Sequence, residues 1–122
     1  MITKVGVQSL TIVQAVNDAL RTMLKEREDV ILLGEDIGKN GGVFRATDGL
    51  LEEFGKERVI DTPLSEAGFT GAAIGMALGG FRPVVEIQFL GFIYPAYEQI
   101  MTHAARMRSR TRGHFPVPLV IR

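Results

Sequence analysis

The sequence contains no cysteine, which excludes disulfide bridges, thiolate nucleophiles and zinc sites built on cysteine ligands. It carries no net charge, since 14 basic residues balance 14 acidic ones, so no overall field favours nucleic acid or an anionic membrane. No apolar stretch approaches the ~20 residues that a membrane-spanning helix needs. Residues 1–6 lack the apolar core of a signal peptide. We therefore expect no nucleic acid and no membrane as partners, and a location in the cytoplasm, or in the mitochondrial matrix for a processed organellar form.

What is present is the composition of an ordinary globular domain, with 46% hydrophobic and 23% charged residues. Helical periodicity and short apolar runs alternate along the chain. Helices are expected over residues 11–25, 47–54, 65–78 and 95–110, and strands over residues 30–33, 58–60, 84–89 and 117–121. Such alternation favours an α/β fold, a parallel sheet with helices on both faces. Ligands of such sheets bind beyond the carboxyl ends of the strands, which selects the loops after residues 33, 60 and 88.

Glu66 is the residue best placed for chemistry, because it lies in the first turn of a helix that follows a strand. Its position has a simpler explanation, since the helix dipole favours a carboxylate there by about 0.3–1 kcal/mol. The same helix carries Gly68, Gly71 and Gly75, although each glycine inside a helix costs up to ~1 kcal/mol relative to alanine. These glycines indicate close packing, either against the sheet of the same chain or against a helix of a second subunit.

The spacing Glu66-x4-Gly71-Ala72-x2-Gly75 resembles the glutamate-and-glycine helix of thiamin-diphosphate enzymes, in their pyrimidine-binding domain. Residues 34–38, 41–47, 61–66 and 86–89 resemble the β subunit of the E1 component of pyruvate and branched-chain 2-oxo acid dehydrogenases. The resemblance extends from about residue 11 to residue 122 without an obvious gap. It implies a transketolase-like fold, with residues 1–122 as a partial pyrimidine-binding domain that is truncated at its C-terminal end.

By this resemblance Glu66 is the catalytic residue, which would hydrogen-bond the N1′ atom of the cofactor's aminopyrimidine. Phe92 would pack on the pyrimidine, and Gln88 would lie beside the ring. The cofactor would decarboxylate the 2-oxo acid, and the acyl group would pass to the lipoyl group of the E2 component. The cofactor-binding residues implied in this way are Leu64, Glu66, Gln88 and Phe92.

The sequence lacks the Gly-Asp-Gly…Asn motif with which thiamin enzymes hold Mg²⁺ and the diphosphate. In the family the α subunit holds that half of the cofactor within an α2β2 tetramer, so Gly68, Gly71 and Gly75 would face that subunit. A structural K⁺ site is also implied, with the backbone carbonyl of Leu119 among its ligands. The expected partners are the E1 α subunit, the lipoyl E2 component and a 2-oxo acid substrate.

Several alternatives stay open at the level of the sequence. The substrate can be pyruvate, a branched-chain 2-oxo acid or acetoin, and the chain can belong to another transketolase-type thiamin enzyme or be a non-catalytic α/β interaction module. Glu35 and Asp36 either face the site or support the Gly-rich loop that contains them. Surface or interface positions are expected for the two histidines and for an arginine run, which comprise His103, His114, Arg106, Arg108, Arg110 and Arg112.

Overall fold

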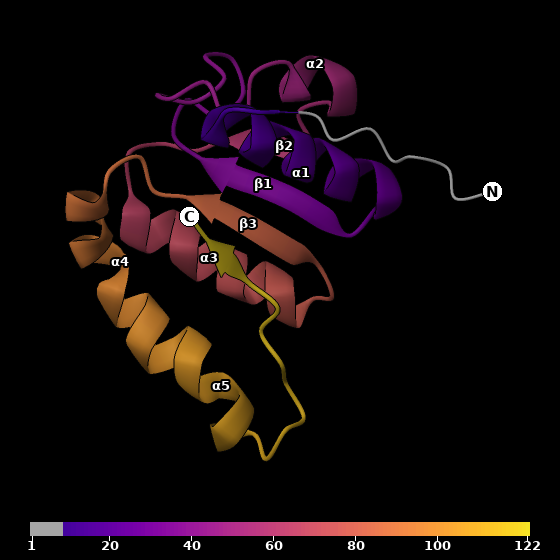
Figure 1. The fold of residues 1–122 in the computed structure, drawn as a ribbon. Coiled ribbons are helices and arrows are strands. Elements are labelled where there is room, and N and C mark those ends of the chain that lie inside the picture. Colours follow the sequence, from indigo (N-terminus) through magenta and orange to yellow (C-terminus); the bar gives the residue numbers. More distant parts are fainter. Residues whose placement is uncertain (1–8) are drawn as a thin grey trace.

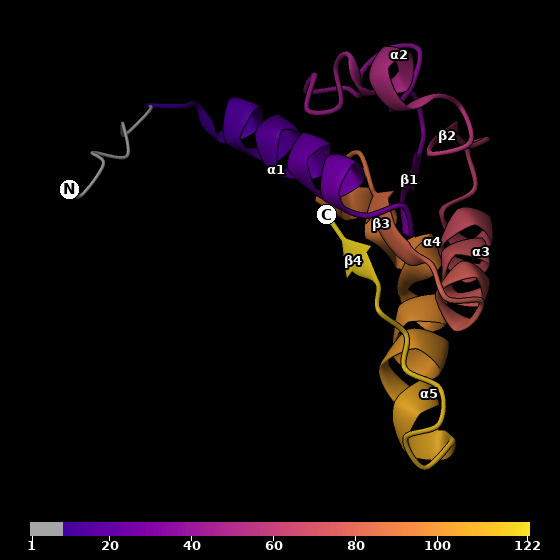
Figure 2. The same cartoon turned by 90° about the vertical axis from the view of Figure 1, so that its right-hand side faces the viewer.

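The computed structural model describes residues 9–122; residues 1–8, on which the signal-peptide prediction rests, lie outside the described part. One parallel sheet with the strand order β2-β1-β3-β4 forms the centre of the fold (Figure 1). Its strands are β1 (Val30–Gly34), β2 (Val59–Asp61), β3 (Arg82–Glu86) and β4 (Val120–Ile121). One face carries α1 (Ile12–Glu26) and α2 (Leu50–Phe54), and the other carries α3 (Glu66–Leu78) and the helices after β3 (Figure 2). The predicted α/β fold with helices on both faces is confirmed.

The first helix and the first strand form where the residue pattern predicts them. Thr11 and Gln14 make a reciprocal capping box at the start of α1, with N···O distances of 2.9 and 3.3 Å. β1 is apolar along its length because both of its faces are covered. Leu32 belongs to the core beneath α1 and α2, whereas Ile31 and Leu33 belong to the core beneath α3.

The carboxyl ends of three strands meet at one edge of the sheet. Gly34, the last residue of β1, is paired in register with Asp61 of β2 and with Glu86 of β3. The chain passes from β1 outward to β2 and then crosses to the other side of β1 to form β3. The topological switch point therefore lies between β1 and β3, where open α/β sheets bind ligands. A Gly-rich loop (residues 35–49) leaves β1 at this point, and residues 87–93 leave β3 beside it.

Several boundaries differ from the predictions. α2 begins after Gly49 instead of at Thr47, because the buried Thr47 hydroxyl donates to the carbonyl of Ile37 at 2.6 Å and belongs to the Gly-rich loop. Ser65 occupies the N-cap position of α3 but its side chain caps no backbone N–H. β3 includes Pro83 within the strand and ends before the predicted residue 89, since the chain turns away there. β4 is only two residues long because only Val120 and Ile121 pair with β3.

The helix predicted over residues 95–110 is present, but it is not regular. A 3-10 turn η1 (Leu90–Ile93) precedes α4 (Tyr94–Glu98), a π-helical segment η2 (Gln99–Ala104) and α5 (Ala105–Arg110). Pro95 lies in the first turn, as predicted. The π-helical segment packs against α3, a change of helical period that apolar spacing alone does not reveal. No helix within residues 9–122 is long and apolar enough to cross a membrane.

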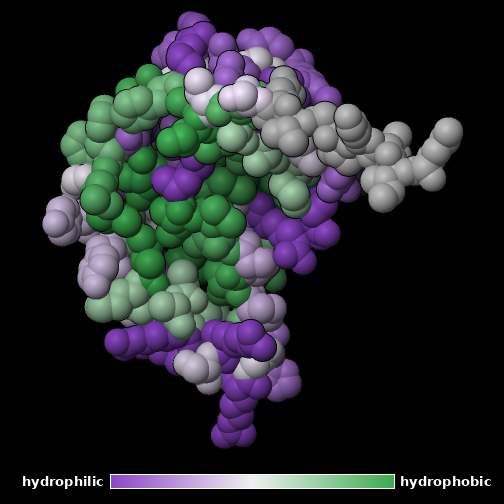
Figure 3. Space-filling model, viewed as in Figure 1, coloured by the Kyte–Doolittle hydropathy of each residue, from purple (hydrophilic) through white to green (hydrophobic). Residues whose placement is uncertain are grey.

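On the α1 side of the sheet, apolar side chains of α1, β3 and β4 gather (Figure 3). They form a groove of about 610 Å³. Leu119, predicted as a K⁺ ligand, precedes β4; its half-buried side chain lines this groove and contacts the core beneath α3. Other apolar residues of the groove include Val16, Leu20, Met23, Val84 and Val120.

Candidate functional site

The structure brings the predicted cofactor-binding residues to the carboxyl edge of the sheet, on the segments that follow β2 and β3 (Figure 1). Glu66 is the first residue of α3 and is partly buried. Gln88 is half-buried between β3 and η1. Leu64 is 81% exposed and Phe92 is 48% exposed, so two large apolar side chains face outward at this edge. This part of the edge is an open surface, which leaves room for a ligand or for a second protein chain.

Phe92 belongs to a row of three phenylalanines. The ring centroids of Phe44 and Phe89, and those of Phe89 and Phe92, are each 5.6 Å apart, in edge-to-face geometry. All three rings are about half exposed. Phe44 comes from the Gly-rich loop after β1, so the row joins the two loops at the switch point. It offers flat apolar surface to a ring-shaped ligand, and no local sequence pattern marked Phe44 and Phe89 as members of the site.

Glu35 is a second carboxyl at this edge, directly after β1 and only 9% exposed. Burial raises the pKa of Glu35, and the negative charges of Glu66 and Asp36 raise it further. Glu35 and Glu66 follow the neighbouring strands β1 and β2 at the same edge of the sheet. Glu35 therefore lies both at this edge and in the loop, and the two roles predicted for it stay open.

Glu86 lies at the same edge but on the α1 side of the sheet, beneath the Gly-rich loop. Its carboxylate is paired with Arg122. A Cβ on Gly42 of the loop would lie 3.1 Å from Oε1 of Glu86. Burial raises the pKa of Glu86, and the positive charge of Arg122 partly offsets this effect. This buried pair supports the loop from below and was not singled out from the sequence.

Replacing Arg122 by glutamine is expected to lower the free energy of unfolding by about 1–2 kcal/mol at neutral pH, less than for a fully buried pair because Arg122 is partly exposed. A carboxyl with a raised pKa binds more protons in the folded state, so its charged form destabilises the fold. The loss should therefore be absent below the ordinary pKa of glutamate and grow as the pH rises through the raised pKa of Glu86. Urea unfolding at several pH values measures this difference.

The matched control for Arg122→Gln is Arg27→Gln, which removes an exposed ion pair with Asp29. Exposed pairs contribute little to stability, so this control should have only a small effect. Equal losses in the two variants, or a loss in Arg122→Gln that does not depend on pH, would contradict the account of Glu86.

The glycines of α3 have different surroundings. A Cβ on Gly68 would lie 2.6 Å from the Ser65 hydroxyl oxygen, and a Cβ on Gly71 would lie 3.2 Å from Oε1 of Gln99 in η2. A Cβ on Gly75 would meet nothing within 4 Å, apart from the helix's own backbone. Only Gly68 is thus crowded by a short side chain of the same chain, because the atom nearest to Gly71 is the end of a flexible glutamine. Gly75 lies on an open face, where packing within the chain does not require a glycine.

The remaining predicted positions do not join this edge. His103 lies in η2 near Glu98, with 3.7 Å between Nε2 and the carboxylate, and His114 is exposed after α5. No group of three or more histidine, aspartate or glutamate residues within residues 9–122 is arranged to hold a metal ion. The arginine run lies on α5 and the turn after it, where Arg106, Arg108, Arg110 and Arg112 are all exposed.

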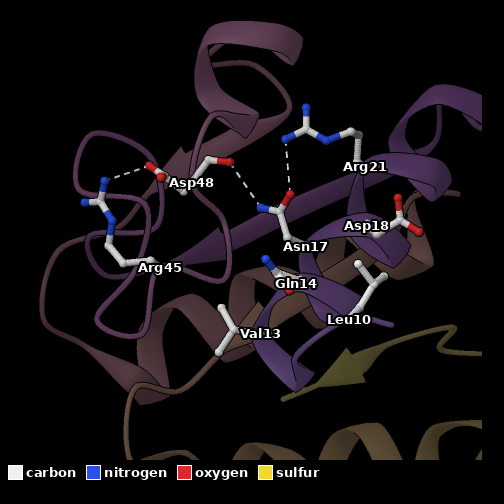
Figure 4. Close-up of a pocket in the computed structure, with 8 residues that line it drawn as sticks. All are labelled: Leu10, Val13, Gln14, Asn17, Asp18, Arg21, Arg45 and Asp48. Atoms are coloured by element: carbon white, nitrogen blue, oxygen red, sulfur yellow. Dashed lines mark hydrogen bonds and ion pairs between the residues drawn. The ribbon is translucent and has the colours of Figure 1, made fainter. Parts of the chain in front are cut away.

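A hollow of about 400 Å³ between α1 and the end of the Gly-rich loop contains none of the predicted residues (Figure 4). There the Asn17 amide nitrogen donates to the carbonyls of Ala46 and Asp48 at 3.0 and 3.1 Å, and its amide oxygen accepts from Arg21. Arg45 pairs with the Asp48 carboxylate at 2.8 Å. The bonds from Asn17 attach the end of the loop to α1. The polar side chains named here are thus hydrogen-bonded to one another or to the backbone.

Comparison with known proteins gives one consistent result. Residues 8–122 match the family described as "Transketolase, pyrimidine binding domain". The chain is 56% identical over 113 residues to the pyruvate dehydrogenase E1 component subunit beta of Staphylococcus epidermidis, and 55% identical to that of Bacillus subtilis. These alignments cover 93% of this chain and 35% of each relative, so the chain spans about a third of the length of the curated relatives it matches. The chain belongs to the transketolase pyrimidine-binding domain family.

Proposed function

We propose that this chain supplies the pyrimidine-binding half of a thiamin-diphosphate site, as the partial pyrimidine-binding domain of a 2-oxo acid dehydrogenase E1 β subunit. The observation that carries the proposal is the position of Glu66, in the first turn of α3 at the carboxyl edge of the sheet. The names of the relatives support it, since they are β subunits of pyruvate dehydrogenase E1. Pyruvate is therefore the first substrate to test, before branched-chain 2-oxo acids and acetoin.

The residues at the edge fit the aminopyrimidine part of the cofactor. Such a ring needs apolar contact on its faces and hydrogen-bonding groups at its rim. Phe92 and Leu64 offer exposed apolar surface, and Gln88 offers an amide. Glu66 would share a proton with the ring nitrogen N1′. Thiamin diphosphate, when bound, supplies the electron sink for decarboxylation, and these side chains would orient and polarise it.

The diphosphate part of the cofactor has no comparable set of residues here. The sequence has no Gly-Asp-Gly…Asn motif, and residues 9–122 contain no acidic cluster suited to Mg²⁺. We therefore propose that the E1 α subunit holds Mg²⁺ and the diphosphate in an α2β2 tetramer, with Gly68, Gly71 and Gly75 facing that subunit. Transfer of the acyl group to lipoyl E2, a K⁺ site at Leu119 and a cytoplasmic location stay predictions.

The experiment that tests this function is a reconstitution. The complete gene product that contains this chain is co-expressed with the E1 α subunit, and CO₂ release from pyruvate and 3-methyl-2-oxobutanoate is measured with thiamin diphosphate and Mg²⁺. We expect turnover that requires both chains and the cofactor. A stable complex that releases no CO₂ from either acid would point to acetoin or another donor. The absence of any complex would favour a single-chain thiamin enzyme or an interaction module.

A further inference from the structure

We propose that Asp61 is a positioning residue, which sets the path of the segment that carries Glu35, relative to the start of α3 with Glu66, by clamping the backbone of the Gly-rich loop. The inference rests on the proposed function, because it concerns the same edge of the sheet. It assigns a role to a side chain that is not among the site residues predicted from the sequence.

The clamp consists of two hydrogen bonds to one carboxylate. The backbone N–H of Gly38 donates to Oδ1 of Asp61 at 2.6 Å, and the N–H of Lys39 donates to Oδ2 at 3.0 Å. Bonds from backbone N–H groups to a charged acceptor are roughly twice as strong as neutral ones. The Asp61 end of the clamp is fixed in the sheet, because Asp61 is the last residue of β2 and is paired in register with Gly34 of β1.

Gly38 is part of the clamp because it has no side chain. A Cβ on this residue would lie 2.9 Å from Oδ2 of Asp61 and 3.1 Å from its Cγ. The carboxylate of Asp61 thus occupies the space that any other residue would fill. An alanine at position 38 would push against a short side chain that is held by two hydrogen bonds, so the clamp would have to open.

The clamp acts on Glu35 because the intervening segment is short. Only Glu35, Asp36 and Ile37 lie between Gly34, which is fixed in the sheet, and Gly38. Asp36 adopts a left-handed conformation with φ of 56°, which costs a residue with a Cβ about 1–2 kcal/mol. The segment therefore needs both of its ends held to keep this path.

The same strand end also positions Glu66. Thr62, the residue after Asp61, donates its N–H to the carbonyl of Gly34 at 3.0 Å, so the start of the segment that leads to α3 lies against the end of β1. The carboxylate of Asp61 and the N–H of Thr62 therefore contact the chain on both sides of Glu35. One residue sets the path of the loop with Glu35 relative to the segment with Glu66.

The test is made on the assembled complex of the complete gene product with the α subunit. Asp61→Asn keeps the shape of the side chain, but its NH₂ group cannot accept from a backbone N–H. We expect faster hydrogen exchange at Gly38 and Lys39 and a loss of turnover of about 10-fold, which corresponds to removal of one net hydrogen bond. Gly38→Ala should give the same result by displacing the carboxylate. Asp48→Asn, an exposed carboxylate of the same loop, should leave exchange at those two amides and turnover unchanged.

A double-variant comparison separates positioning from general support of the fold. If Asp61 acts through Glu35, Glu35→Gln should itself lower turnover, and adding Asp61→Asn should lower it little further. Losses that multiply, or full turnover in Asp61→Asn and in Gly38→Ala while the amides exchange freely, would overturn the positioning role and leave the proposed function standing. If the unmodified complex shows no turnover dependent on thiamin diphosphate, the proposed function fails, and the positioning role fails with it.

Discussion

Replacing Glu66 by glutamine should lower the turnover of the assembled complex at least about 100-fold, the usual contribution of a positioned acid or base. Glutamine keeps the size of the side chain and can still donate and accept hydrogen bonds, but it cannot exchange a proton with N1′ of the pyrimidine. Binding of thiamin diphosphate should change much less than turnover, because Phe92 and Leu64 would remain available to contact the ring. Steady-state CO₂ release and calorimetric titration with the cofactor measure the two quantities separately.

The control for Glu66→Gln is Glu52→Gln, which removes an exposed carboxylate from the first turn of α2. If Glu66 serves only the helix dipole, both variants should lose about 0.3–1 kcal/mol of stability and no turnover. Full turnover in Glu66→Gln would support that structural explanation and refute a catalytic role. It would also favour a non-catalytic interaction module over an enzyme.

The second large effect is expected from Gly75→Leu, which should weaken association with the α subunit by about 10- to 100-fold, as expected when a packed contact is overfilled by 1–3 kcal/mol. The chain's own fold should not suffer, because a Cβ at this position meets nothing within 4 Å. Leucine favours a helix over glycine, so the thermal midpoint of the isolated chain should stay equal or rise. Analytical ultracentrifugation of the mixed subunits measures the association.

A control for Gly75→Leu is Thr22→Leu, which adds a similar apolar side chain at an exposed position of α1. This variant should assemble like the unmodified chain. Unchanged assembly in Gly75→Leu would mean that the open face of α3 is turned to solvent. Weakened assembly in both variants would point to nonspecific effects of exposed leucine.

The fold could be predicted because buried strands and helix ends each have a recognisable local pattern of residues. β1 is covered on both faces, so it reads as an unbroken apolar run, and the capping box of Thr11 and Gln14 marks the start of α1. Glycines also predicted the ends of α2 and α3, since Gly55 and Gly79 follow the last residues of these helices. Such signals are local, and they were sufficient to order the helices and strands.

The site could be predicted only in part, because much of it depends on contacts between distant segments. The row formed by Phe44, Phe89 and Phe92 joins loops that follow different strands, and no periodicity relates them. The clamp between Asp61 and the loop at Gly38 is visible only when β1 and β2 are paired. The π-helical segment η2 follows from packing against α3, because an apolar pattern fits a regular helix equally well.

The most direct test of the central claim is the crystal structure of the assembled complex with thiamin diphosphate bound. We expect a carboxylate oxygen of Glu66 at about 2.6–3.2 Å from N1′ of the pyrimidine, which is a normal hydrogen-bond distance. Phe92 should contact the ring, and the diphosphate and Mg²⁺ should be held by residues of the α subunit. A pyrimidine ring bound away from Glu66, or a diphosphate held by residues of this chain, would contradict the account.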